Sequence, residues 1–249
     1  MRYVDCTYLE IATHASNGWL ALIPMGCTEQ QGPHLGVGFD TWFAEELLLA
    51  ASERAAADHQ IGCLVLPPLP YGPTPEHRGF RTGYVDLPVA LHDAVCDAVL
   101  ESLAEQGFSR LVVWRGCGGH DLRARIGHFN QRWRGQARAF LPDPPLHQIW
   151  CRVTDSDVAG GHADSFTTSI ALHRHPELVR PDRVPGPSHG PVDWDDSGLD
   201  FTAYSSSGVI GDPRHGSAER GAALWSECVA WTVGLIRQVA AANSDPPRK

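Results

Sequence analysis

The sequence predicts an α/β fold: a three-layer αβα sandwich with a mostly parallel central sheet. Short segments that are apolar throughout recur along the chain, and longer segments with helical periodicity separate them. Strands without polar alternation are typical of a parallel sheet that helices cover on both faces. In addition, clusters of polar residues follow several of the apolar segments, which is where an open α/β sheet usually forms its binding site.

Composition and charge limit the function classes. The chain has 249 residues, of which 43% are hydrophobic, and we expect a single domain at 1–243 with a disordered tail at 244–249. A net charge of -9 argues against a nucleic-acid partner, since phosphate binding requires clustered Lys and Arg. No signal peptide, membrane span or Cys-x-x-Cys pair is predicted, so the scattered cysteines are expected to be reduced thiols in a cytoplasmic protein.

Hydrophobic periodicity and the Pro and Gly residues at element boundaries predict the elements of the amino-terminal half. Apolar residues at 40–59 recur at helical spacing, and the apolar strand at 61–66 ends at Pro67. Pro88 near the first turn and Gly107 just past the last turn are typical helix boundaries. The predicted elements are helices at 8–15, 40–59 and 88–106 and strands at 19–24, 61–66 and 110–114.

The remaining segments alternate less regularly. The loop at 69–84 is long for a compact domain, and loops of this length are often functional. Residues 176–215 are rich in Pro, Gly, Ser and Asp, which predicts irregular structure near the site. The other predicted elements are helices at 121–133, 163–173 and 216–241, a proline-rich linker at 141–145 and a fourth strand at 147–153.

Three clusters of polar residues follow strand ends or open helices. Mixed carboxylate, imidazole and thiolate side chains suit zinc or another divalent transition metal. A metal held there would polarise a carbonyl group and activate a water molecule for amide hydrolysis. The alternative for the first cluster is a polar surface loop, because the spacing alone is not specific. The clusters are Glu29, Gln31, His34 and Asp40, then Cys117 and His120, then His162 and Asp164.

Residues 26–35 read Gly-Cys-Thr-Glu-Gln-Gln-Gly-Pro-His-Leu and are followed by Asp40. This stretch resembles the signature of the creatininase (creatinine amidohydrolase) family. The resemblance covers nearly the whole chain. It implies an αβα sandwich, usually a homohexamer, with a two-metal site that hydrolyses cyclic amides, formamides or a peptide end. The further matches are Tyr71-Gly72 with Glu76-His77, Gly116 to Gly119, His162-Ala163 with Thr168-Ser169, and Gly208 to Gly221.

Three positions depart from the family pattern. Family members usually have a His that binds the second metal where this chain has Gln31, and another metal-binding His where it has Cys117. The acidic residue that usually precedes Thr-Ser is Thr167 here. The resemblance therefore does not imply a complete second metal site, since an amide oxygen is a poor zinc ligand beside imidazole.

Three hypotheses for the function remain open. In the first, one divalent metal, expected to be zinc, is held by Cys117 together with Glu29 and Asp40, the two ligands that the resemblance implies. His162 or His120 is then the general acid or base of an amidohydrolase. In the second, no metal binds and Cys117 is a nucleophile paired with His120, because a helix N-terminus lowers the pKa of a thiol. In the third, the protein is a non-catalytic binding or structural subunit.

The remaining candidates concern the substrate, which is expected to be a small cyclic or acyl amide. Glu76 and His77 lie in the long loop that matches the family, and they are predicted to bind the substrate together with Gln31 and His34. His34 alternatively only caps or orients its loop. Cys27 is expected to pack in the core, where small apolar side chains are common.

Overall fold

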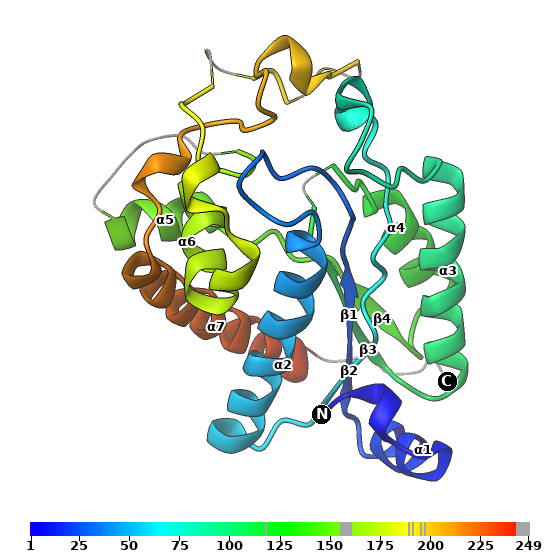
Figure 1. Ribbon diagram of the computed structural model, residues 1–249. Coiled ribbons are helices and arrows are strands. Elements are labelled where there is room, and N and C mark those ends of the chain that lie inside the picture. Colours follow the sequence, from blue (N-terminus) through cyan, green and yellow to red (C-terminus); the bar gives the residue numbers. More distant parts are fainter. Residues whose placement is uncertain are drawn as a thin grey trace.

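The structure, a computed structural model, describes residues 1–117, 119–154, 161–188, 190, 192–194, 196 and 198–242 (Figure 1). The predicted tail at 244–249 lies outside the described residues, and the single domain at 1–243 stays a prediction. Parallel strands form the central sheet in the order β2-β1-β3-β4. They are β1 (Leu20–Met25), β2 (Cys63–Val65), β3 (Arg110–Arg115) and β4 (Arg138–Phe140).

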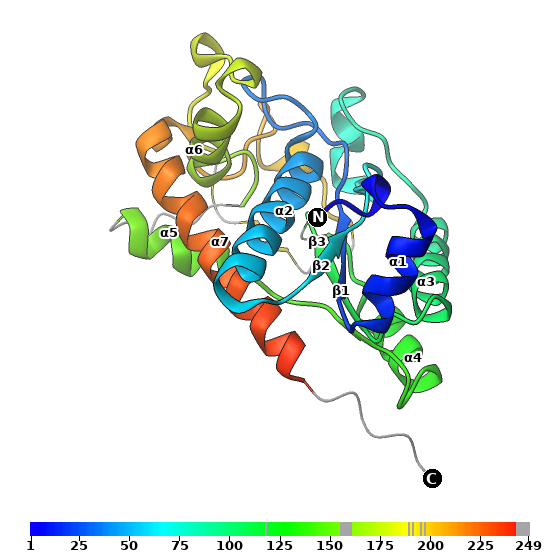
Figure 2. The same cartoon turned by 90° about the horizontal axis from the view of Figure 1, so that it is seen from below.

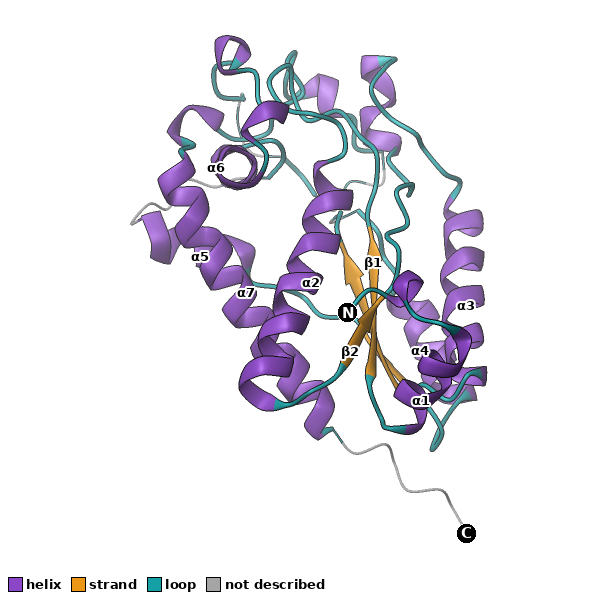
Figure 3. Cartoon of the chain, turned by 60° about the horizontal axis from the view of Figure 1, so that its bottom comes forward, coloured by secondary structure: helices purple, strands orange, loops and turns teal. Residues whose placement is uncertain are grey.

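Helices cover both faces of this sheet. They are α1 (Tyr8–Ser16), α2 (Phe39–His59), α3 (Val89–Glu105), α4 (Arg123–Arg132), α5 (Leu146–Thr154), α6 (Ser165–Arg174) and α7 (Ala218–Ala241). Figure 2 shows α2, α6 and α7 on one side and α1, α3 and α4 on the other, and Figure 3 shows the strands between them. The predicted αβα sandwich is therefore confirmed. Among the described residues, no helix combines the length and apolarity needed to cross a membrane.

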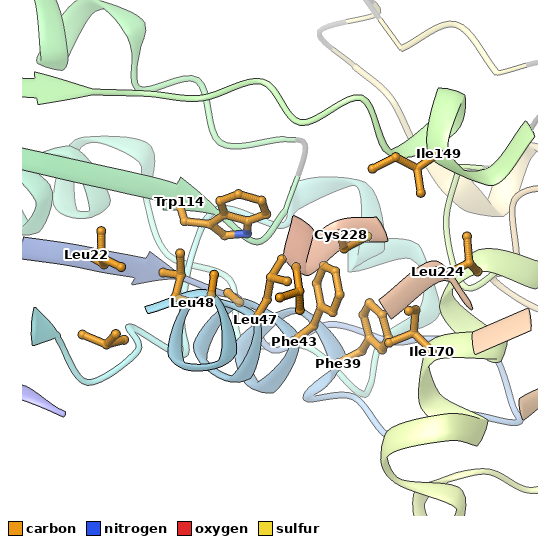
Figure 4. Packing of buried hydrophobic residues seen from close by; sticks show 14 of the residues in the cluster. Leu22, Phe39, Phe43, Leu47, Leu48, Trp114, Ile149, Ile170, Leu224 and Cys228 are labelled. Atoms are coloured by element: carbon orange, nitrogen blue, oxygen red, sulfur yellow. The ribbon is translucent and has the colours of Figure 1, made fainter. Parts of the chain in front are cut away.

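Alternate side chains of the central strands pack into two separate cores. Leu22 of β1 and Trp114 of β3 join Phe43 in the core formed with α2 and α7 (Figure 4). The next side chain along β1, Ile23, and its neighbour Val113 on β3 belong to the core on the α3 face. Both faces of β1 and β3 are therefore buried, which explains why the buried parts of these two strands are apolar.

The predicted strand at 147–153 is wrong, because these residues form most of helix α5. Leu146, Ile149, Trp150 and Val153 recur at helical spacing, and the middle two are buried where α5 packs against α7. The fourth strand is instead β4, whose sequence Arg-Ala-Phe has no apolar run that would predict a buried strand.

The order of the strands determines where the site forms. The chain passes from β1 through α2 to β2, and from β2 through α3 to β3 on the far side of β1. The connections that leave β1 and β3 therefore run in opposite directions. Ligands of open α/β sheets bind outside the carboxyl ends of the strands at such a switch point.

Two glycines bring the ends of β1 and β3 against the first turn of α2. A Cβ atom at Gly26 would lie 2.5 Å from Thr41 Cα, and one at Gly116 would lie 2.6 Å from the Asp40 carbonyl oxygen. Side chains do not fit at either position, since both near atoms belong to the backbone. The cysteine that follows each glycine is therefore held close to the start of α2.

Candidate metal centre

Loops after neighbouring strands meet at one buried cluster of acidic, thiol and imidazole side chains. Glu29 comes from the loop after β1, and Cys117 comes from the loop after β3. Within the described chain, Glu29 belongs to three groups of potential metal ligands, and in each group the ligand atoms lie within 4.8 Å of one another. These groups combine Glu29 with His77 and His162, with Cys27 and Asp40, and with Glu76 and Cys117.

Carboxylates and thiols form one half of the cluster, the carboxylate–thiol side (Cys27, Glu29, Asp40 and Cys117). The Cys27 sulfur lies 3.0 Å from Glu29 Oε2 and 3.4 Å from Asp40 Oδ2. The Cys117 sulfur lies 3.6 Å from Glu29 Oε2. The Gln31 amide nitrogen donates to Asp40 Oδ2 at 2.8 Å. All of these side chains are buried, so the acidic groups face one another with little access to water.

The chemistry of the carboxylate–thiol side fits a divalent metal. Burial, together with the neighbouring Glu29, raises the pKa of Asp40 well above its usual range. Burial also raises the pKa of Glu29, but the hydrogen bond from His77 and the nearby His162 ring outweigh it and hold this pKa at about 2. Asp40 therefore keeps a proton beside an ionised Glu29. A divalent cation would replace that proton, and carboxylate and thiolate are donors that zinc accepts.

Gln30 orders the other half of the cluster, the imidazole side (Gln30, His77 and His162). Its Oε1 accepts the Gly32 N–H at 2.9 Å, so its Nε2 is the donor that reaches His77 Nδ1 at 3.0 Å. Because His77 Nδ1 accepts this bond, neutral His77 carries its proton on Nε2. That N–H group faces Glu29 Oε2 at 3.4 Å, so His77 supports the carboxylate rather than offering a lone pair.

His162 presents a lone pair to the cluster. Its Nε2–H group donates to the Gln30 carbonyl oxygen at 2.6 Å, and its Nδ1 lies 3.4 Å from Glu29 Oε1. Burial lowers the pKa of His162 to about 4 despite the opposing charge of Glu29, so the ring is neutral at pH 7. The Nδ1 lone pair therefore faces the Glu29 carboxylate, beside which a proton accepted by the ring would be stabilised.

A cavity of about 670 Å³ opens onto the cluster. Glu29, Asp40, Cys117 and His162 all line it, so both sides of the cluster are reached from the same space. This volume lies in the range of roughly 300–1,000 Å³ that is typical of small-molecule sites. Aromatic rings supply much of the remaining wall. They belong to Phe39, Phe43, Trp150, Phe166, Trp194 and Phe201.

The predicted substrate-binding residues lie in different places. Glu76 lines the cavity, whereas Gln31 and His77 contact the buried carboxylates. His34 is fully buried, and its Nε2 lies 2.9 Å from Thr168 Oγ1, which ties the loop after β1 to α6. This contact is consistent with the alternative prediction, in which His34 only orients its loop. Substrate binding by these four residues stays a prediction.

His120 and Asp164 have mainly structural neighbours. The His120 ring packs against His92 of α3 with ring centroids 4.6 Å apart, and burial followed by the His92 ring lowers its pKa to about 4. One His120 ring nitrogen lies within 4.8 Å of the Cys27 and Cys117 sulfurs. Asp164 caps α6 by accepting two backbone N–H groups of its first turn.

The electrostatics disfavour Cys117 as a metal-free nucleophile. A hydrogen bond from Cys27 lowers the pKa of the Cys117 thiol, but burial and the carboxylates of Glu29, Asp40 and Glu76 raise it to about 12. The thiolate is the reactive form, and it is scarce at neutral pH when the pKa is this high. A cation bound beside the sulfur would remove this obstacle, but it would also make Cys117 a ligand.

Sequence reasoning missed the roles of Cys27 and Gln30. Cys27 is buried, as expected, but its neighbours are carboxylates rather than apolar side chains. Gln30 orients two imidazoles that are distant in sequence. The available signal was their position between Gly26 and Asp40, the loop that carries the predicted ligands. Only the folded arrangement shows which loop side chains point inward.

A family model described as creatinine amidohydrolase matches residues 4–236. The chain belongs to the creatininase family. This confirms the family suggested by the sequence motifs, and it places the whole cluster, from Cys27 to His162, inside the matched region.

Named relatives and solved structures agree with this assignment. The mycofactocin precursor peptide peptidase of Mycolicibacterium smegmatis is 29% identical over 224 residues, covering 88% of this chain and 85% of the relative. The creatinine amidohydrolase of Pseudomonas putida is 25% identical over 247 residues, covering 90% and 91%. A creatininase crystal structure matches with a TM-score of 0.83 at 21% identity over 97% of this chain and 98% of the other, which confirms the fold. Other solved creatininases include zinc and manganese forms.

Proposed function

We propose that this creatininase-family protein is an amidohydrolase that holds one divalent metal, preferably zinc, through Glu29, Asp40 and Cys117. The observation that carries the proposal is the buried contact of two carboxyl groups with two thiols at the edge of a cavity of about 670 Å³. Buried acidic groups without a cation are costly, so such a cluster favours metal binding. Solved creatininases include a Zn-Zn form and a manganese form, which supports the use of a divalent metal.

Gln31 supports one metal rather than two. Its Nε2 donates to Asp40 Oδ2 at 2.8 Å and lies 3.5 Å from Glu29 Oε1. Gln31 thus presents an N–H group to the carboxylates, where a ligand of a second cation would present a lone pair. At another position of the family's metal site, Thr167 offers a hydroxyl group in place of an acidic side chain, and that hydroxyl lies 3.4 Å from Asp164 Oδ1.

The protein's own side chains supply the proton transfers. When bound, the metal would polarise the amide carbonyl and lower the pKa of a water molecule. His162 Nδ1, which is neutral and unprotonated, accepts a proton from the attacking water and returns it to the leaving nitrogen. The bond from His162 Nε2 to the Gln30 carbonyl fixes the ring and its tautomer. His77 donates toward Glu29 and holds that carboxylate in place.

The proposed substrate is a small cyclic or acyl amide. The aromatic wall of the cavity would pack against apolar groups on either side of the scissile C–N bond. Related proteins named as a peptide peptidase and a creatinine amidohydrolase support the choice of C–N hydrolysis, and they differ in the size of the substrate. The homohexamer and the cytoplasmic location stay predictions from the sequence.

Metal-dependent hydrolysis tests the proposal. Metal content per chain is measured by mass spectrometry, and the metal-free and reloaded proteins are assayed on a panel of lactams, cyclic ureas, formamides and short peptides. We expect about one metal per chain and turnover only in the loaded protein. His162→Asn should keep the metal and lose about 10²-fold or more in kcat. Asp58→Asn, at an exposed position of α2, is the matched control.

Two outcomes would contradict the proposal in different ways. Two metals per chain with turnover would show that Gln31 and Thr167 do not prevent a second site. One metal per chain without hydrolysis of any panel member would leave a metal-binding protein and exclude the amidohydrolase within those substrate classes.

A further inference from the structure

We propose that Cys27 is a metal ligand alongside Cys117, so that two sulfurs and the carboxylates of Glu29 and Asp40 hold the ion. This inference rests on the proposed function for the location of the ion, but it concerns which ion the protein selects. Thiolates are soft donors that favour zinc, whereas manganese prefers carboxylate, carbonyl and water oxygens. A second sulfur would therefore make the centre selective for zinc over manganese.

The distances around Cys27 are those expected between ligands of one tetrahedral zinc ion. With Zn–S bonds of about 2.3 Å and Zn–O bonds of about 2.0 Å, a bound sulfur and a bound oxygen lie roughly 3.5 Å apart. The Cys27 sulfur is 3.0 Å from Glu29 Oε2 and 3.4 Å from Asp40 Oδ2, and the Cys117 sulfur is 3.6 Å from Glu29 Oε2. Three edges of such a tetrahedron are therefore present in the structure.

Core packing does not account for the surroundings of Cys27. Cys96, another buried cysteine, belongs to the apolar core on the α3 face, as a small hydrophobic residue should. Cys27 is equally buried but contacts two acidic side chains. Without a metal, these contacts require the Cys27 thiol to donate to Glu29 and the protonated Asp40 to donate to the weakly accepting Cys27 sulfur. A shared cation satisfies both contacts.

His120 provides a second, independent observation. Its ring is buried, and neither Nδ1 nor Nε2 makes a well-formed hydrogen bond within the described structure, although the Pro73 carbonyl is nearby. One ring nitrogen lies within 4.8 Å of both sulfurs. Protonated thiols are weak acceptors, whereas metal-bound thiolates accept N–H groups. Metal binding by Cys27 and Cys117 would therefore provide the partner that His120 lacks.

Four protein donors also leave a route for water. Zinc sometimes expands to five ligands in catalytic sites. Asp40 and Cys117 line the cavity, so a water molecule would reach the ion from that side. The ligand assignment is therefore compatible with hydrolysis.

Absorption spectroscopy of the cobalt-substituted protein tests this assignment. The full-length protein is stripped of metal under reducing conditions and titrated with Co²⁺, and the near-ultraviolet sulfur-to-cobalt band reports the number of thiolate ligands. We expect a two-thiolate intensity in the wild type and about half of it in Cys27→Ser and in Cys117→Ser, because each variant retains one sulfur donor. The double variant should show no band. Cys96→Ser is the matched control and should keep the full band.

A competition experiment gives a second readout. Wild-type protein is expected to prefer Zn²⁺ to Mn²⁺, and this preference should fall by about 10-fold or more in Cys27→Ser, because one soft donor is lost. Cys27→Ala repeats the measurement without a new hydroxyl group. Circular dichroism verifies that each variant is folded. An unchanged preference in folded variants would overturn the assignment.

The outcomes separate this inference from the proposed function. Two results would overturn the Cys27 assignment. One is a one-thiolate intensity in the wild-type protein, and the other is a full band in folded Cys27→Ser. Metal-dependent turnover would still support the amidohydrolase in either case. Conversely, a two-thiolate band that halves as expected in a protein without turnover supports the ligands and contradicts the proposed reaction.

Discussion

The two sides of the cluster balance their buried polar groups in different ways. On the imidazole side, the Gln30 side chain and carbonyl bind His77 and His162 and fix their tautomers. On the carboxylate–thiol side, Asp40 keeps a proton beside an ionised Glu29. Protein hydrogen bonds thus organise the first side, whereas in the proposed function a cation completes the second side. The difference indicates which substitutions should alter metal binding and which should alter proton transfer.

Asp40→Asn should have the largest effect, and it acts on the carboxylate–thiol side. We expect metal affinity to fall by more than about 100-fold, because a charged ligand is lost. The metal-free variant should be at least as stable as the wild type, since one of two adjacent buried carboxyl groups is removed. Competition with a chelator and urea unfolding measure the two effects, and Asp58→Asn is the control. A strongly destabilised metal-free variant would contradict this account of the site.

Acid should destabilise the metal-free protein through the imidazole side. The pKa of His162 is lowered from 6.5 to about 4 in the folded chain, so the unfolded chain binds its proton first as the pH falls. This contribution to stability is complete above pH 6.5 and is lost between pH 6.5 and 4. It amounts to about 3 kcal/mol at 1.36 kcal/mol per pKa unit.

His162→Asn isolates that contribution. Urea unfolding of the chelated variant at several pH values should show a shallower loss of stability between pH 6.5 and 4 than the wild type shows. Parallel curves for the two proteins would mean that His162 is not the group responsible.

Gly116→Ala should move the carboxylate–thiol side as a unit. The new Cβ atom would meet the Asp40 carbonyl at 2.6 Å, so α2 and the loop after β3 must separate. We expect a loss of about 1–3 kcal/mol in unfolding free energy, as for other overpacked sites, together with weaker metal binding. Gly127→Ala in α4 is the control, because nothing lies within 4 Å of its Cβ position. Equal stability of the two variants would argue against the close approach.

Gln30→Glu should give the smallest effect and act only on the imidazole side. A carboxylate cannot donate to His77 Nδ1, so the proton of that ring would move to Nδ1. We expect metal content to be unchanged and kcat to fall by about 10-fold with a shifted pH profile, because the orientation of the rings is disturbed. Loss of metal from this variant would mean that the two sides cannot be treated separately.

Much of the sheet was predictable because burial on both faces leaves a continuous apolar sequence. The strands near Leu22 and Val113 follow this rule, and they were located within a few residues. The segment at 147–153 was misassigned because a short apolar run does not distinguish a strand from a buried helix. Ile149 and Trp150 belong to a helix that packs against α7. The sequence of the segment does not show which element covers it.

The sequence by itself determined the family, the αβα architecture and the presence of Glu29 and Asp40 in one loop. Those conclusions follow from local periodicity and from a motif of adjacent residues. The tertiary structure decided that Cys27 contacts both carboxylates and that Gln30 orients His77 and His162. The Cys27 contacts depend on how the connection from β1 to α2 folds back on itself, and the Gln30 contacts join segments distant in sequence. No local sequence pattern specifies either arrangement.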